Sequence, residues 1–385
     1  MLPLSGKESA IKVSNIVGDR YLQGISQIIC DHVTLPKSQR IDTQNIIHAC
    51  VAIAGSRDSI SGFQYMHHGL PSHTTCLNVL HKLDVNELVE QSSNMLISSA
   101  KRVIRQGHKY TFAIDIVKEP YYGQRDGEYS NYIVGGKRKA STNYFFGYLT
   151  LYICDNAHRI TLLAVPWTRK LSLLEGVTTC IELIRKLGLK IRCLCMDREF
   201  YVTSIFRYLQ EEGVPHIVPV KEAGVDLKNE VSGNVSKFFS YKLNKNSNDA
   251  LEIAICDCVV YLKGKRGKHG KRHHAFVICN VPHSFRWVRE VYSQRFGIES
   301  SYRMKNIPKA KTCSKDPGIR YFYSLVSYMF QNTWIQIQWD RFAKVQRGPK
   351  VVRSRIFQLK HLISIIQSEI LNLFPIREIK EIAFS

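Results

Sequence analysis

The chain has 385 residues, of which 44% are hydrophobic and 22% charged. This length and composition exclude a small peptide module, a largely disordered chain and a collagen-like protein, and they predict two or three folded domains. Lysine and arginine exceed aspartate and glutamate by 22 charges, which argues against small-molecule metabolism and predicts a polyanionic partner, either nucleic acid or an acidic membrane surface.

Membrane insertion and secretion are not indicated by the sequence. Its apolar runs fall short of the 18 or so residues that a membrane helix requires, and its first residues lack the charged-then-apolar order of a secretory signal. The 11 cysteines are scattered and odd in number, which is typical of reduced thiols. We therefore expect a cytoplasmic protein without structural disulfides.

Residues 1–105 are predicted to be helical, with helices over 43–54, 58–66 and 72–83. Ser72 is the expected N-cap of the third helix. That helix would present a polar face formed by His73, Thr74, Asn78 and His81. Two interpretations fit this pattern, a helix-turn-helix DNA-binding domain and a plain helical bundle.

From residue 110 the pattern changes to strands, predicted over 110–117, 144–154 and 159–166, the last two forming a hairpin. A helix (172–187), a strand (190–196), a helix (202–212) and a strand (216–220) follow. This order is typical of a mixed α/β sheet covered on both faces, as in ribonuclease H-like folds.

Three further strands are predicted over 237–243, 251–262 and 274–279, within a β insertion at residues 222–286. Helices are predicted over 286–305 and 321–338. An apolar seam then runs from Ile356 to Leu373 at spacings of three and four, which would pack within the chain or pair two chains. We thus expect a helical domain (1–105), a ribonuclease H-like core (106–221 and 287–345), the insertion and a helical C-terminal segment (346–385).

Two aspartates stand out because they occupy strand positions. Asp115 lies inside an apolar strand, where a charge is costly unless a partner or metal compensates it, and Asp197 directly follows another apolar strand. If these strands are neighbours, both carboxylates would face the same divalent cations. The helix at 288–305 offers a third carboxylate, Glu299, which shares a face with Tyr292 and Arg295; the alternative is a plain Arg295–Glu299 surface ion pair.

Taken together, Asp115, Asp197 with the following Arg-Glu-Phe, and the pattern Tyr292-x-x-Arg295-x-x-x-Glu299 resemble the DDE transposases of prokaryotic insertion sequences. The similarity is to the group with a Tyr-Arg-Glu-Lys helix signature and a β insertion, and it covers roughly residues 110–340. In that signature the lysine follows after six intervening residues. Here Lys305 comes after five.

The resemblance implies a ribonuclease H-like core in which Asp115, Asp197 and Glu299 are catalytic and hold two Mg²⁺ or Mn²⁺ ions. It implies cleavage of DNA at terminal inverted repeats, strand transfer to target DNA, a homodimer on DNA and a nucleoid-associated location. A metal-dependent nuclease without strand transfer and an inactive DNA-binding protein remain alternatives.

DNA contacts are expected from two parts of the chain. Tyr292, Arg295 and Lys305 of the signature helix would contact DNA near the cut. A basic loop between two strands of the insertion would lie on phosphates without reading sequence. Its basic residues are Lys265, Arg266, Lys268, Lys271 and Arg272.

Overall fold

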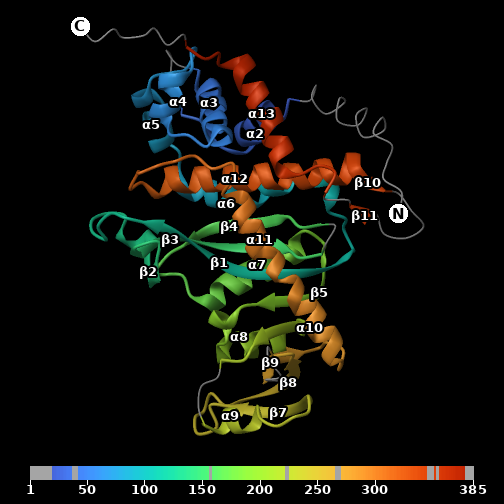
Figure 1. Ribbon diagram of the computed structural model, residues 1–385. Helices are drawn as coiled ribbons and strands as arrows, with labels where there is room; N and C mark the ends of the chain where they lie inside the picture. The colour runs from blue at the N-terminus through green and yellow to red at the C-terminus, as the bar shows by residue number, and fades with distance from the viewer. Residues whose placement is uncertain are drawn as a thin grey trace.

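The computed structural model describes residues 20–36, 42–155, 158–221, 225–264, 270–344, 351–352 and 355–377. A helical layer lies at the top of Figure 1, the long helix α12 crosses beneath it, and a mixed sheet with its flanking helices extends below. The all-helical N-terminal region and the mixed α/β class predicted from the sequence are confirmed.

The N-terminal helices each begin at a residue suited to capping, α2 excepted. Asp42, Ser59, Ser72 and Asp84 accept hydrogen bonds from the first free backbone N–H groups of α3 to α6. The predicted N-cap role of Ser72 is confirmed, and Thr74, Asn78 and His81 are exposed as expected. The helices are α2 (Tyr21–His32), α3 (Thr43–Ser56), α4 (Ile60–Met66), α5 (His73–His81) and α6 (Val85–Ser98), followed by the short turn η1 (Lys101–Val103).

The central sheet has the order β4-β3-β1-β5-β6, with β1, β5 and β6 parallel and β3 antiparallel to both β1 and β4. This confirms the expected ribonuclease H-like sheet and the predicted β3–β4 hairpin. The strands are β1 (Lys109–Tyr121), β2 (Ile133–Lys139), β3 (Thr142–Ile153), β4 (Thr161–Trp167), β5 (Lys190–Met196) and β6 (His216–Pro219).

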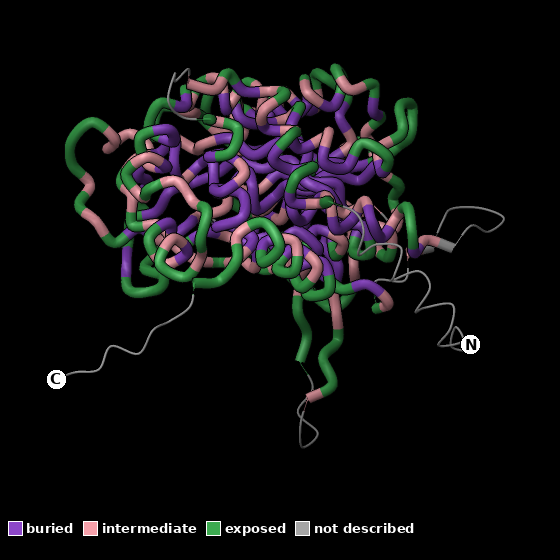
Figure 2. The backbone as a smooth tube through the Cα atoms, turned by 90° about the horizontal axis from the view of Figure 1, so that it is seen from above, coloured by how far each residue is buried: buried purple, intermediate pink, exposed green. Residues whose placement is uncertain are grey.

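The insertion extends this same sheet. Its strands are β7 (Lys237–Leu243), β8 (Leu251–Leu262) and β9 (Gly270–Cys279), preceded by α9 (Val225–Glu230). Strand β9 pairs antiparallel with β6, where His216 lies opposite Cys279, and β8 and β7 follow outward. The exposed far ends of β8 and β9 project from the body of the protein in Figure 2.

Helices cover both faces of the sheet. One face packs against α7 (Leu173–Lys186), which begins with a capping box at Ser172, and α8 (Thr203–Glu211). The other face carries α10 (Phe285–Gln294), α11 (Phe296–Lys305) and α12 (Pro317–Ile337). A single helix was predicted over 286–305, but the structure divides it at Arg295, two residues before Gly297.

Helix α12 joins the helical layer to the sheet. Asp316 caps it and also bonds His81 at the end of α5, with Nδ1 2.5 Å from Oδ2. Nearly every residue of α12 is buried, because it contacts β4 and α11 as well as α3, α5 and α6. One hydrophobic cluster therefore runs from the N-terminal helices into the sheet, as the continuous buried centre of Figure 2 illustrates.

Most of the C-terminal seam packs within the chain, as the first of the two predicted interpretations expected. Helix α13 (Leu359–Leu373) buries Leu362, Ile366 and Ile370 and contacts α2 and α3. Gly55 of α3 permits this approach, since a Cβ there would lie 2.9 Å from the Cγ2 of Ile366. The remaining elements are η2 (Ser130–Tyr132), η3 (Arg198–Phe200), the π turn η5 (Gln338–Phe342), β10 (Ala343–Lys344) and β11 (Val351–Val352).

Two further expectations concerned the cysteines and membrane-spanning helices. All 11 cysteines are free thiols, and eight of them are buried. Within the described stretches, no helix is both long enough and apolar enough to cross a membrane.

Candidate active site

Strand register brings Asp115 and Asp197 together. In the parallel pair of β1 and β5, Ile114 is the partner of Met196, so the next residue of each strand is Asp115 on one and Asp197 on the other. Asp115 is followed by more strand, whereas Asp197 directly follows β5 and caps the short turn η3 by accepting from the N–H of Glu199 at 2.8 Å. The predicted adjacency of the two strands is confirmed.

The environment of the two carboxyl groups disfavours their ionisation. Burial raises the pKa of Asp115 from 3.8 to about 6, and the negative charge of Asp197 adds to this effect. Burial likewise raises the pKa of Asp197. Paired carboxyl groups with raised pKa values mark a site where a bound cation would be stabilising.

Arg295 lies between Asp115 and Glu299. Its Nη1 is 3.7 Å from Oδ2 of Asp115 and its Nη2 is 3.5 Å from Oε1 of Glu299. The Arg295–Glu299 ion pair of the alternative interpretation is therefore present, but the Arg295 side chain is only 10% exposed and also faces the strand aspartate, unlike a plain surface pair. Glu299 itself is half exposed, at 50% of its side-chain surface.

Tyr292 fixes the orientation of this arginine. Its hydroxyl accepts a hydrogen bond from Nε of Arg295 at 3.1 Å, and its ring packs on that of Phe276 at a centroid distance of 4.8 Å. Burial is the main reason that the pKa of Tyr292 rises to about 12, so the hydroxyl stays protonated. The division of the predicted helix at Arg295 thus coincides with the residue that points into the site.

A second ion pair at the rim was not predicted. Lys118 of β1 and Glu199 of η3 form it, with Nζ 3.0 Å from Oε1. Little in the sequence indicates this pair. Lys118 and Glu199 come together only through the register of β1 with β5, which no local pattern specifies. The pair places one more charge of each sign beside Asp197.

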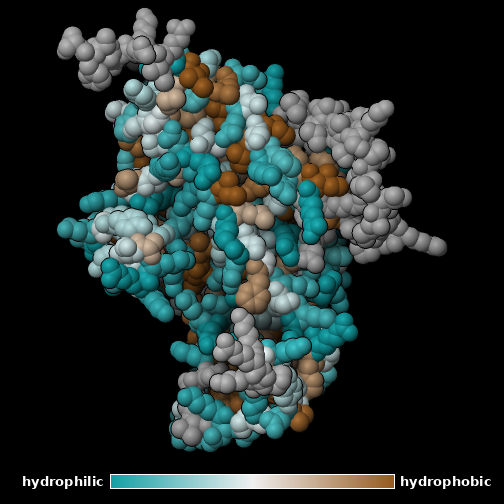
Figure 3. All heavy atoms as spheres, in the orientation of Figure 1, coloured by the Kyte–Doolittle hydropathy of each residue, from teal (hydrophilic) through white to brown (hydrophobic). Residues whose placement is uncertain are grey.

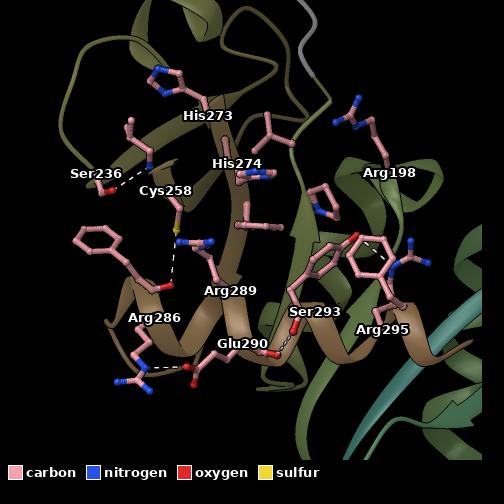
Figure 4. Close-up of a pocket in the computed structure, with 18 of the residues that line it drawn as sticks. Arg198, Ser236, Cys258, His273, His274, Arg286, Arg289, Glu290, Ser293 and Arg295 are labelled. Atoms are coloured by element: carbon pink, nitrogen blue, oxygen red, sulfur yellow. Dashed lines mark hydrogen bonds and ion pairs between the residues drawn. The ribbon is translucent and has the colours of Figure 1, made fainter. Parts of the chain in front are cut away.

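A pocket of about 800 Å³ opens from Asp197 and Arg295 toward the insertion. Figure 4 shows its wall of β8 and β9 facing α10, with Arg289 and His274 extending between them and Arg295 at one end. Its lining combines cations with aromatic rings, a chemistry suited to a nucleic acid strand. The cationic and imidazole side chains are Arg198, His273, His274, Arg286, Arg289 and Arg295, and the rings are Phe276, Phe285, Tyr292 and Phe296.

The basic loop of the insertion lies partly outside the described residues, and that part includes Lys265, Arg266 and Lys268. Lys271 and Arg272 are on β9, and both are exposed. The amine of Lys271 donates to the carbonyl of Gly233 at 2.7 Å and to Asn234 Oδ1 at 2.9 Å. Arg272 therefore has the freer side chain of the two.

Lys305 corrects one expectation. The sequence suggested a DNA contact, but the side chain is fully buried under the sheet, where its amine bonds Glu119 and lies 3.1 Å from Ser324 Oγ. Its charge also faces the rings of Tyr148 and Tyr328. DNA cannot reach Lys305 in this structure, because burial and the ion pair with Glu119 hold it inside the core.

The donor set fits a hard divalent cation. Asp115 and Asp197 offer only carboxylate oxygens, which Mg²⁺ and Mn²⁺ prefer to thiols or imidazoles. Across the described ranges, no three histidine, cysteine, aspartate or glutamate side chains lie close enough to form a ready metal cluster. The third carboxylate is instead held by Arg295.

Comparison with known families gives an independent result. The model of the transposase DDE domain matches residues 109–310, which is more than half of the chain. The match begins at the first residue of β1 and ends shortly after α11, so it includes Asp115, Asp197 and Glu299. No curated protein matches the chain significantly.

Proposed function

The chain belongs to the transposase DDE domain family, and we propose that it cuts DNA at the terminal inverted repeats of an insertion sequence and joins the ends to target DNA. The observation that carries this proposal is the pair of adjacent carboxyl groups, Asp115 within β1 and Asp197 directly after the parallel strand β5. Their raised pKa values support a role in holding cations.

We assign Asp115, Asp197 and Glu299 as the ligands of two divalent ions, Mg²⁺ or Mn²⁺. Such ions supply activation of an attacking oxygen and charge stabilisation of the leaving oxygen in phosphodiester cleavage and transesterification. The protein itself positions the three carboxylates. Asp115 and Asp197 are fixed by β1 and β5, while Glu299 lies on α11, where Arg295 pairs with it. No nucleophilic side chain is required.

Arg295 would bind the phosphate next to the cut. Its guanidinium is oriented by Tyr292 and already faces two carboxylates, so binding a phosphate would require it to share or exchange these partners. Tyr292 lines the pocket beside Arg295 and would contact the same strand. Both roles are part of the proposal.

The wider DNA path would follow the basic side of the protein. The pocket lined by Arg198, Arg289 and His274 leads from the carboxylates to the insertion, where Arg272 and Lys271 are exposed. Lys265, Arg266 and Lys268 would continue it. Holding two ends at once calls for a homodimer on DNA, and a protein of this kind would associate with the nucleoid.

The test is incubation of the purified protein with DNA that borders its gene, in Mg²⁺ or Mn²⁺, beside Asp197→Asn and Glu299→Gln. Glu182→Gln is the matched control, since Glu182 is an exposed carboxylate of α7, outside the pocket. Cuts at the repeat ends plus joined strands, lost in both variants and kept in the control, are expected. Cuts without joining would indicate a nuclease, and binding without cuts an inactive DNA-binding protein.

A further inference from the structure

One end of the sheet carries a β-hairpin, formed by β2 and β3, to which the proposed active site assigns no function. Strand β2 pairs with the first part of β3, and Lys139 lies opposite Thr142, so Ala140 and Ser141 form a two-residue turn. Both turn residues have positive φ, 49° and 67°, as tight hairpin turns require. The chain here is therefore a closed β ribbon and not an irregular loop.

The ribbon is shaped to present positive charge. Gly135 pairs with Tyr144, and the next pair is Lys139 with Thr142, so three residues of β2 oppose a single residue of β3 in a bulge. Lys137 and Arg138 belong to this bulge. Every residue from Gly135 to Ser141 is exposed, and the corresponding end of the protein projects at the left of Figure 1 and is largely hydrophilic in Figure 3.

The three cations pair with no carboxylate in the part of the chain that the structure describes. No ion pair found between described residues involves Lys137, Arg138 or Lys139. Three consecutive exposed cations on an edge ribbon also prevent association of strands. Such a ribbon suits the phosphates of duplex DNA.

The pairing register of β1, β3 and β2 determines how far the cations of the hairpin lie from Asp115. From Asp115 the strand continues six residues to Tyr121, whose partner is Tyr144, and two more residues lead to Thr142 beside Lys139. Eight extended residues span about 26 Å. Phosphates on one DNA strand follow one another every 3.4 Å or so along the axis, so this distance corresponds to roughly eight nucleotides.

We propose that the β2–β3 ribbon is a DNA-binding arm whose cations contact backbone phosphates roughly seven to nine nucleotides from the cleaved bond. The inference rests on the proposed function, because it places duplex DNA at Asp115. The arm adds affinity and fixes the position of the duplex without reading sequence. It takes no part in the chemistry.

The test compares wild type with K137A/R138A/K139A by phosphate-ethylation interference on the DNA end that the protein cleaves. The matched control is K109A/K186A/K190A, which removes three exposed cations at the opposite, amino ends of β1 and β5. Interference at the seventh to ninth phosphates is expected in wild type and control and absent in the arm variant. The arm variant should bind about tenfold more weakly, with a salt slope lower by about 2 to 3.

Outcomes separate the arm from the proposed function. If wild type cuts the DNA but its interference pattern matches that of the arm variant, the arm proposal is overturned while the transposase assignment stands. The same holds if the arm variant binds as tightly as wild type, or if an acidic protein or a second copy of the chain, and not DNA, protects the arm from proteolysis. If wild type neither binds nor cuts the ends, both proposals fail.

Discussion

Lys305 of α11 and Glu119 of β1 form an ion pair inside the protein, beneath the same strand that carries Asp115. Lys309 binds the other oxygen of Glu119 at 2.6 Å. Burial by itself would raise the pKa of Glu119, but the two lysines lower it well below 4.5. The pair therefore ties the helix of Glu299 to the strand of Asp115.

Lys305→Met should destabilise the protein by about 2 to 4 kcal/mol, because it leaves the buried Glu119 with one cation where it had two. Urea unfolding would measure this. The stabilising effect of ionised Glu119 exists above pH 4.5 and is lost as the pH falls toward 2, so the stability difference between wild type and variant should narrow over that range. Arg303→Met, an exposed change on the same helix, should stay within about 0.5 kcal/mol; equal stability of both variants would refute the buried bridge.

Asp115→Asn should make the protein more stable at neutral pH. The folded state raises the pKa of Asp115 to about 6, so wild type loses stability as the pH rises from about 4 through 6. The neutral amide escapes this loss, which amounts to at most about 3 kcal/mol. Unfolding curves from pH 4 to pH 8 should converge at the acidic end and separate above pH 6, while the exposed Asp126→Asn follows wild type throughout.

Divalent metal should stabilise the wild type and fail to stabilise variants that lack one of the paired carboxylates. Mg²⁺ or Mn²⁺ at ten times its Kd would add about 1.4 kcal/mol to the unfolding free energy. Thermal unfolding of wild type, Asp115→Asn and Asp197→Asn, with and without EDTA, measures this directly. An equal rise in Tm for all three proteins would mean that the metal binds elsewhere.

Arg295→Gln should reduce cleavage roughly 100-fold, in line with the loss of one donor to a transition-state charge. It should also shift the acidic limb of the pH–rate profile to higher pH. The reason is that the guanidinium lowers the pKa of Asp115, which would rise further without it. Arg185→Gln is the control, since Arg185 is an exposed arginine of α7 that pairs with Glu212 and lies outside the pocket; an unshifted profile in the Arg295 variant would contradict the pairing with Asp115.

Much of the fold could be predicted because strand patterns are local. The bounds of β5, β7 and β8 agree with the predicted 190–196, 237–243 and 251–262. Strand β2 was missed, since Gly135, Gly136 and three consecutive cations are typical of a loop and its pairing depends on β3. Helix α6 was missed because polar residues outnumber the buried Leu88, Met95 and Leu96.

For the candidate site, the aspartates were predictable and their surroundings were not. A charged residue in an apolar strand is visible in the sequence, and element order alone predicts that β1 and β5 are neighbours. The burial of Lys305 depends on Glu119, 186 residues away along the chain. The same holds for Lys118 with Glu199, whose pairing follows from a register that no local pattern specifies.

The burial of α12 determines which fragments of the chain could fold. A fragment beginning near residue 105 would keep the whole segment matched to the DDE domain, yet it would lose α3, α5 and α6 and uncover the side of α12 that they contact. Buried aromatic residues such as Phe322 and Phe330 belong to that helix. Such a minimal catalytic fragment should aggregate, and the helical layer therefore serves as a folding partner of the sheet, whatever else it binds.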